Sequence, residues 1–153
     1  MTFRMMEQKD LEMLFDLFNE FVKESLDEYD VDLNIKFIKK VAGHYVETSF
    51  VAEKDGKIVG VLAGDIIGSP SFNTPIYQEQ VWFFSKVHRF HGIGLLKFAE
   101  SILKDCGVSH IVMANMANSK AEKLARFYKR MNYKPMEIHY IKALWGYYEV
   151  NVS

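Results

Sequence analysis

The stretch from Ile76 to Phe98, "IYQEQVWFFSKVHRFHGIGLLKF", constrains the fold more than any other part of the chain. Its first half is rich in the β-branched and aromatic residues that favour strands, and its last part places apolar residues at helical spacing. Gly92 and Gly94 mark the change from one pattern to the other. The stretch therefore predicts a strand that ends at Val87, a short glycine loop, and a helix that starts near Ile93.

A strand that turns directly into a helix can bind an anion. The first N–H groups of a helix lack partners within it and carry about half a positive charge, and glycines let a ligand approach the backbone closely. Leu95 follows Gly94 where a nucleoside-triphosphate loop needs lysine, and Lys97 replaces the third glycine of a dinucleotide loop. An isolated Gly-x-Gly can also be a simple turn former. Arg89, three residues before Gly92, and the flanking strand and helix favour a binding loop.

The other elements predict a mixed α/β sheet with helices on both faces. From periodicity and turn residues we expect strands at 2–6, 49–54, 57–67, 76–87, 110–114 and 133–144, and helices at 10–24, 34–46, 93–106 and between Ser119 and Asn132. Asp10 is a candidate N-cap, and Asp55-Gly56 suits a type I′ turn. Gly107 and Asn132 are placed to end helices in the left-handed conformation. Ser119 and Glu122 have capping-box spacing.

Composition and charge limit the functional classes. The chain of 153 residues is 49% apolar and has a formal net charge of −1, which fits one domain over residues 1–153 with a sizeable core. This charge gives no support for nucleic-acid binding, and no apolar run could span a membrane. Cys106 is the only cysteine and the N-terminus does not resemble a signal peptide, so we expect a cytoplasmic protein. The spacing of the five histidines and Cys106 predicts no metal site.

The segment Arg89-Phe90-His91-Gly92-Ile93-Gly94 matches Arg/Gln-x-x-Gly-x-Gly/Ala, and here the chain resembles the GNAT superfamily of N-acetyltransferases. In that family the loop binds the pyrophosphate of acetyl-CoA. The preceding strand is similar too, with Phe84 where valine is usual and Lys86 where proline is common. "LARFYKRMNYKP" resembles the family's closing helix and strand, with Asn132-Tyr133 in place of Gly-Phe. The resemblance covers roughly Thr2 to Leu144 and implies a mostly antiparallel sheet that splays at the acetyl-CoA site.

The resemblance implies which residues bind the cofactor. Backbone N–H groups would hold the pyrophosphate, from residues His91, Gly92, Ile93, Gly94 and Leu95. The strand backbone would pair with the pantetheine arm, at residues Phe84, Ser85 and Lys86. Arg89 would lie near the phosphates or hold the loop in place. Asn118 would hydrogen-bond the cofactor or cap a helix, because it lies one turn before the commonest position in the family, which Ala121 occupies here.

Two residues are candidates for catalysis. Tyr128 stands where the family's closing helix carries the tyrosine that protonates the leaving thiolate, although its spacing also fits a core tyrosine. Glu79 lies where several relatives place a general base, and strand alternation decides whether it faces the acceptor. Gln78 and Gln80 face the other way unless a bulge shifts the register. A solvent-facing Glu79, with proton removal through water, is the alternative.

These expectations describe an acetyl-CoA-dependent N-acetyltransferase that acetylates a small amine, a peptide N-terminus or a lysine by direct transfer. A non-catalytic acyl-CoA-binding sensor or interaction module on the same fold is the alternative, and an enzyme that uses another acyl donor is a third reading. The first two helices and the acidic connection between them would form the acceptor site. The aromatic tail "WGYYEV" is a candidate homodimer interface.

Overall fold

The computed structural model describes residues 1–26, 35–116, 120–140 and 142, without the side chains of residues 35–38. The chain forms two compact units, Met1–Asn118 and Ser119–Ser153, and each is described by itself. The expectation of one domain over the whole chain stays a prediction.

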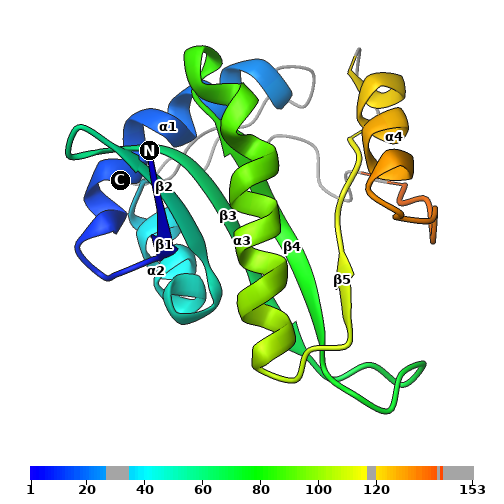
Figure 1. Ribbon diagram of the computed structural model, residues 1–153. Helices are drawn as coiled ribbons and strands as arrows, with labels where there is room; N and C mark the ends of the chain where they lie inside the picture. The colour runs from blue at the N-terminus through cyan, green and yellow to red at the C-terminus, as the bar shows by residue number, and fades with distance from the viewer. Residues whose placement is uncertain (27–34, 117–119, 141, 143–153) are drawn as a thin grey trace. The chain divides into compact units, whose positions relative to one another are not determined.

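A five-stranded sheet with the order β1-β2-β3-β4-β5 is the frame of the first unit (Figure 1). Its strands are β1 (Thr2–Met5), β2 (Phe50–Lys54), β3 (Lys57–Ile67), β4 (Ile76–Phe84) and β5 (His110–Val112). The first four strands pair antiparallel, and β5 pairs parallel with β4. The predicted mixed and mostly antiparallel sheet is therefore confirmed.

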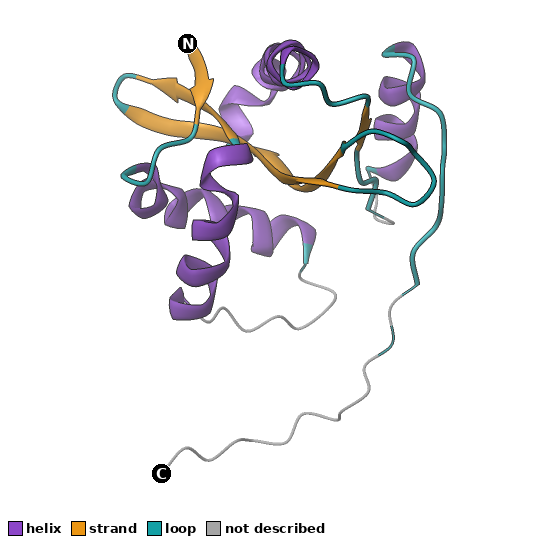
Figure 2. Cartoon of the chain, turned by 90° about the horizontal axis from the view of Figure 1, so that it is seen from below, coloured by secondary structure: helices purple, strands orange, loops and turns teal. Residues whose placement is uncertain are grey.

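Helices cover both faces of this sheet, as predicted. The helices α1 (Asp10–Ser25) and α2 (Ile35–Tyr45) lie on one face, and α3 (Gly92–Asp105) lies on the other (Figure 2). Two short 3₁₀ helices, η2 (Val46–Thr48) and η3 (Lys86–His91), precede β2 and α3. No helix in the described parts of the chain is both long and apolar enough to cross a membrane.

Side-chain alternation along the strands builds a separate apolar layer on each face. The layer beneath α1 and α2 consists of Met6, Leu11, Leu14, Leu17, Val46, Val51, Ile58, Val61 and Phe83. Beneath α3, the ring of Phe50 lies 6.2 Å from Phe98 of α3 and 6.2 Å from Tyr77 of β4. Each β4 residue can thus be assigned to the α1 face or to the α3 face.

The predicted turn and stop residues have the expected backbone conformations. Asp55 and Gly56 have φ of 52° and 74°, as a type I′ turn requires of both central residues. Gly107 ends α3 at φ 81°, and Asn132 follows the last helix at φ 65°. Each of these backbone conformations depends on the identity of only one or two residues, so the sequence alone predicts it.

The start of α1 differs from the prediction. Lys9 is the N-cap, and Asp10 is the first helical residue, with a fully buried side chain. Its carboxylate accepts hydrogen bonds from both terminal nitrogens of Arg4, at 2.7 and 2.8 Å, and from the N–H of Glu7. Arg4 also donates to Glu53 of β2. Asp10 therefore ties the start of α1 to β1 instead of capping its own helix.

The second unit contains α4 (Ala121–Arg130), in which Tyr128 is buried. Ser119, half of the predicted capping box, lies outside the described residues. The strand predicted at 133–144 is wrong for the residues that can be checked, because 134–140 have no strand pairing. Pro135 cannot donate a backbone hydrogen bond, and the described residues of this unit offer no strand for these residues to pair with.

Candidate active site

The pairing between β4 and β5 stops early. It joins Ile76–Gln78 to His110–Val112, and no strand pairs with β4 on that side beyond Gln78 in the part of the chain that is described. The two strands diverge from this point (Figure 1), while β4 continues to Phe84. The sheet thus splays at the carboxyl end of β4.

Glu79 is the first residue beyond the last pair, and its side chain bridges the break. Its carboxylate accepts the N–H of Ala114, beyond the end of β5, at 2.6 Å, and also the N–H of Trp82 on β4. The side chain is only 8% exposed. The carboxylate therefore supplies acceptors to the backbone on both sides of the break.

A β-bulge sets the direction of Glu79. Ala63 pairs with Val81 and Gly64 pairs with Glu79, which leaves Gln80 as an extra residue on β4. Glu79 shares a face with Tyr77, two residues earlier, and Tyr77 lies on the α3 face. Val81 packs against the layer beneath α1, on the opposite face. The bulge that sequence analysis left open therefore falls at Gln80.

The environment of Glu79 changes its acidity. Burial raises the pKa of its carboxyl to about 7, although the hydrogen bonds from Ala114 and Trp82 favour the charged form. A carboxyl group that titrates near neutral pH can accept and release a proton under physiological conditions. Glu79 thus has the acidity that a general base needs.

The segment after β4 differs from the predicted glycine loop. The strand ends at Phe84, three residues before the predicted end at Val87, and η3 occupies Lys86–His91. Ser85 still donates its N–H to the carbonyl of Val59 on β3. Lys86 donates its N–H to the carboxylate of Glu20 on α1 at 3.1 Å, so it leaves the ladder. The capture of this donor explains the shorter strand and takes Lys86 out of it.

The start of α3 has fewer free donors than expected. Gly92, the first helical residue, donates its N–H to the carbonyl of Arg89. The second and third residues of an α-helix have no acceptor within the helix, and these are Ile93 and Gly94. Leu95 is the fourth residue, where helical bonding normally begins, and its side chain is fully buried. Ile93 and Gly94 are therefore the best-placed donors for an anion.

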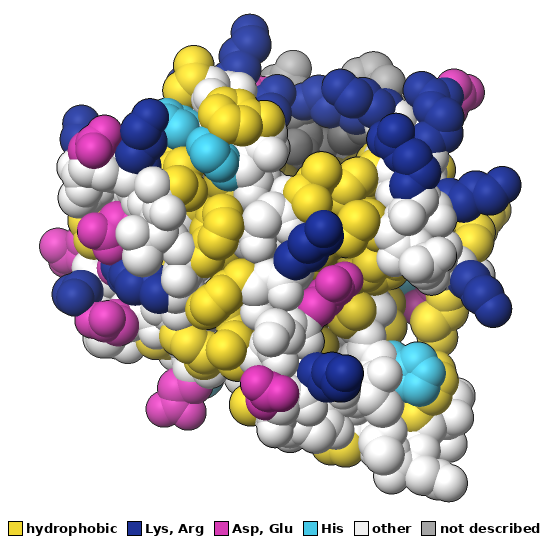
Figure 3. Space-filling model, in the orientation of Figure 1, with side chains coloured by type: hydrophobic (Ala, Val, Ile, Leu, Met, Phe, Trp, Pro, Cys, Tyr) yellow, Lys and Arg dark blue, Asp and Glu magenta, His cyan; other side chains and the backbone are white. Residues whose placement is uncertain are grey.

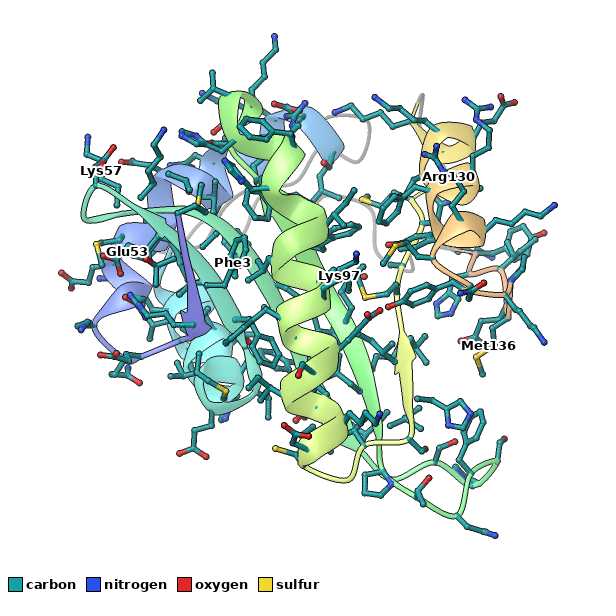
Figure 4. The ribbon with its side chains drawn as sticks, in the orientation of Figure 1. Phe3, Glu53, Lys57, Lys97, Arg130 and Met136 are labelled. Carbon is teal, nitrogen blue, oxygen red and sulfur yellow. The ribbon has the colours of Figure 1, made fainter. Side chains whose placement is uncertain are left out.

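The two glycines of the motif are explained by packing. A Cβ on Gly94 would lie 2.6 Å from the ring of Phe3, which extends from β1 toward α3 (Figure 4). A Cβ on Gly92 would lie 3.3 Å from the ring of Trp82. Both missing side chains point at protein and not at open space. Gly94 lets α3 approach the sheet closely, a packing role that the sequence did not predict, and the binding role of its N–H stays a prediction.

Arg89 holds η3 against α1. Its guanidinium forms an ion pair with the carboxylate of Glu24 and lies 5.8 Å from the centre of the Phe83 ring. Of the two roles open for Arg89, this contact supports the structural one. Glu20 and Glu24 were missed from the sequence, although their spacing of four residues places them on one face of α1.

Two histidines of η3 lie side by side. The Ser85 hydroxyl is 3.0 Å from Nδ1 of His88, and the rings of His88 and His91 are stacked with centres 6.5 Å apart. The ring of His91 also lies 3.9 Å from that of Phe90. Partial burial lowers the pKa of His91, as do the positive charges of His88, the amino terminus and Lys54.

Two predicted site residues lie outside the first unit's described part. Tyr128 belongs to the second unit, where its ring packs 5.3 Å from Tyr133 and 5.6 Å from Phe127. Asn118 is not among the described residues. Glu79 and the segment from Phe84 to Leu95 lie in one unit, and the catalytic role of Tyr128 stays a prediction.

The described residues contain no group of three or more His, Cys, Asp or Glu side chains that could hold a metal ion. In the first unit, the candidate groups for chemistry are Glu79 at the break and the donors and histidines at the start of α3.

Comparison with known proteins gives consistent results. The sequence profile of the acetyltransferase (GNAT) family matches residues 11–133. No curated protein sequence is significantly similar to this chain.

Similar solved structures are acetyltransferases at low sequence identity. A possible acetyltransferase from Clostridium difficile 630 has a TM-score of 0.72 and 17% identity, over 95% of this chain and 98% of that chain. An aminoglycoside acetyltransferase from an uncultured soil metagenomic sample has a TM-score of 0.71 and 16% identity, over 94% of this chain and 96% of that chain. Ribosomal-protein-alanine N-acetyltransferase from Brucella melitensis biovar Abortus 2308 has a TM-score of 0.70 and 13% identity, over 94% and 98%. These likenesses confirm the predicted fold class.

Proposed function

Because this chain belongs to the acetyltransferase (GNAT) family, we propose that it transfers an acetyl group from acetyl-CoA directly to a primary amine of an acceptor. One observation carries the proposal: the β4–β5 pairing breaks after Gln78, and the buried carboxyl of Glu79 lies at the break. Beyond Gln78 no described strand lies against this side of β4, which gives an extended ligand an edge to lie along, and Glu79 puts a proton acceptor beside it.

In this proposal the coenzyme lies along β4. The N–H groups of Ile93 and Gly94 hold the diphosphate, helped by the positive end of α3. The pantetheine arm runs back along β4 from Phe84 toward Glu79, over about 17 Å of strand. His91, Gly92 and Leu95 shape this end of the helix. The N–H groups of Ser85 and Lys86 already have acceptors, so the arm pairs with earlier residues of the strand.

The reaction breaks the thioester C–S bond and forms an amide C–N bond. The protein must remove a proton from the amine and supply one to the leaving thiolate. We assign the first task to Glu79, whose pKa of about 7 suits it, and the second to Tyr128. Because two N–H groups already occupy the carboxylate of Glu79, a water molecule can relay the proton between the amine and this group.

The proposed acceptor is a small cationic amine. The sequence between the first two helices, "DEYDVD" at 27–32, is acidic and would attract such a group. One structure of similar fold is that of an aminoglycoside acetyltransferase. A peptide N-terminus and a lysine are the other acceptors to test.

The second candidate is a non-catalytic acyl-CoA-binding sensor. It is favoured by the two backbone hydrogen bonds to Glu79, because a carboxylate that only holds the splayed strands together would make the same contacts. Both candidates bind an acyl-CoA, so turnover distinguishes them.

A screen of amine acceptors with acetyl-CoA, read out by release of the free thiol, tests the enzyme. We expect thiol release that depends on the acceptor, and we expect Tyr128→Phe to lose most turnover while it keeps its affinity for CoA. A protein that binds CoA but releases no thiol with any amine, peptide or lysine acceptor would support the sensor.

A matched pair of variants tests the binding site. Gly92→Glu should abolish thermal stabilisation by CoA, because it adds a negative charge at the start of α3 that repels a bound diphosphate. Gly92→Ala adds the same Cβ, 3.3 Å from Trp82, without the charge and should keep most of the stabilisation. Equal stabilisation of the two variants by CoA would place the coenzyme elsewhere.

A further inference from the structure

The short helix η3 presents three different faces. A 3₁₀ helix has three residues per turn, so side chains at i and i+3 lie one above the other. Arg89 faces α1 and pairs with Glu24, and His88 stacks on His91 on another side. The third side carries Val87 and Phe90.

This third face is apolar and open to solvent. Val87 is 73% exposed and Phe90 is 74% exposed, and Ile93, one turn further, is 44% exposed. Val87 and Phe90 are the most exposed large apolar side chains among the described residues of the first unit. Figure 3 shows apolar side chains and histidines side by side at the end where α3 begins. Exposed apolar groups of this size at one place indicate a binding surface.

The charges around this face select the kind of ligand. Lys86, His88 and His91 are interleaved with the apolar residues, and Lys54 is close enough to affect the acidity of His91. The start of α3 adds the positive end of the helix dipole and the N–H groups of Ile93 and Gly94, which have no acceptor within α3. Two carboxylates of α1 contact η3: Glu20 accepts the backbone N–H of Lys86, and Glu24 pairs with Arg89. A flat apolar ring joined to phosphate groups complements such a surface.

We propose that Phe90, backed by His91, is the stacking surface for the adenine base of the coenzyme. This inference rests on the proposed function and adds the residue that recognises the nucleoside. Phe90, in the last turn of η3, lies three residues before Ile93 of α3, about 5 to 6 Å along the helix axis. A nucleoside attached to a diphosphate at Ile93 and Gly94 reaches that distance. Its base would cover the Phe90 ring, as aromatic side chains stack on bases in single-stranded nucleic acids.

Calorimetric titration with three probes tests the proposal: CoA, adenosine bisphosphate as its nucleotide half, and phosphopantetheine, which lacks the nucleoside. Phe90→Ala should weaken binding of CoA and of adenosine bisphosphate by roughly 5- to 100-fold, the usual effect of losing one base-stacking ring. Its affinity for phosphopantetheine should not change. Phe90→Trp should restore binding of both nucleotides.

Phe72→Ala is the matched control. Phe72 precedes β4, at the opposite end of the strand from η3, and its ring packs 4.3 Å from that of His110. This variant should bind all three probes like the parent protein. Thermal unfolding of each variant checks that the fold is intact.

The outcomes separate this inference from the proposed function. If the parent protein binds CoA and Phe90→Ala binds it equally well, the stacking surface is wrong and the proposed function stands. If the parent protein binds neither CoA nor acetyl-CoA, both fail. If Phe90→Ala instead turns a dimer into a monomer, as light scattering would show, the face is an interface between copies and the inference is overturned.

Discussion

At the residue scale, Glu79 links the fold to pH. Its folded pKa of about 7 lies above its usual value of 4.5, so the folded protein binds this proton more tightly than the unfolded chain does. The stabilisation from the bound proton is complete below the usual value and is lost as the pH rises through 7. Each unit of pKa shift corresponds to about 1.4 kcal/mol, so this group alone lowers the free energy of unfolding by about 2 to 3 kcal/mol between pH 4.5 and pH 8.

Glu79→Gln should remove this dependence. The amide oxygen can still accept one backbone N–H, but the side chain no longer titrates. We expect the stability difference between parent and variant to shift by about 2 kcal/mol in favour of the variant from pH 5 to pH 8. Urea denaturation at both pH values measures it. A constant difference would mean that Glu79 is ionised throughout this range.

Two glycines in helices should respond in opposite ways to alanine. In α3, Gly94→Ala places a Cβ 2.6 Å from the ring of Phe3, and we expect a loss of about 1 to 3 kcal/mol from overpacking. In α2, the Cβ of Gly43→Ala would meet nothing within 4 Å, and a gain of about 0.5 to 1 kcal/mol follows from helix propensity. Chemical denaturation of both variants provides the comparison. Equal effects of the two substitutions would argue against close packing of α3 on β1.

At the element scale, the contacts that position η3 show what sequence analysis can and cannot reach. Asp55-Gly56 and Gly107 were predicted because each satisfies a local backbone requirement. The ion pair of Arg89 with Glu24 joins residues 65 positions apart, and the bulge at Gln80 depends on pairing with β3. Neither the ion pair nor the bulge produces a pattern in the local sequence from which it could be predicted. The strand end at Val87 was wrong for the same reason, because Glu20 on α1 captures the N–H of Lys86.

The start of α1 gives a test at the same scale. Burial alone would raise the pKa of Asp10, but the hydrogen bonds from Arg4 and from the N–H of Glu7 hold it below its usual range. Its stabilising effect is therefore present above the usual value of 3.8 and is lost as the pH falls through the lowered folded value. Replacing Asp10 should therefore lower the stability more at neutral pH than at pH 3.

Asp10→Asn should cost about 2 to 4 kcal/mol at pH 7, because it leaves Arg4 without its buried partner. The cost should shrink toward pH 3. Glu53→Gln, which removes the more exposed partner of Arg4, should cost less than about 1 kcal/mol. Denaturation curves at both pH values measure these costs. An equal cost for the two substitutions would contradict the conclusion that Asp10 is the main partner of Arg4.

At the scale of the whole molecule, charge is distributed unevenly along the chain. Residues 1–119 contain 12 basic and 17 acidic side chains, and residues 120–153 contain 7 basic and 3 acidic ones. The near-zero net charge of the chain is therefore the sum of a long negative segment and a short positive one. The loop and the order of elements were enough to predict the family from the sequence, and the family profile confirms it. The proposed acceptor site includes residues 27–34, which lie outside the described part of the chain.

The second unit also exposes apolar residues at alternate positions. Met136, Ile138 and Tyr140 are 61%, 79% and 91% exposed, in a segment with the period of a strand. We expect self-association at high concentration, which Ile138→Lys should reduce. His139→Lys adds the same charge at the alternate, polar position and should have little effect. Light scattering over a concentration series measures this, and a parent protein that stays monomeric throughout would refute it.

The three-faced geometry of η3 limits how this protein can vary. Each residue of a 3₁₀ helix turns the chain by a third of a revolution. Removing or inserting a single residue before Arg89 would rotate its guanidinium away from α1 and bring a neighbour into its place. Homologous chains should therefore keep the number of residues between β4 and α3 constant, even where the exposed Val87 is replaced.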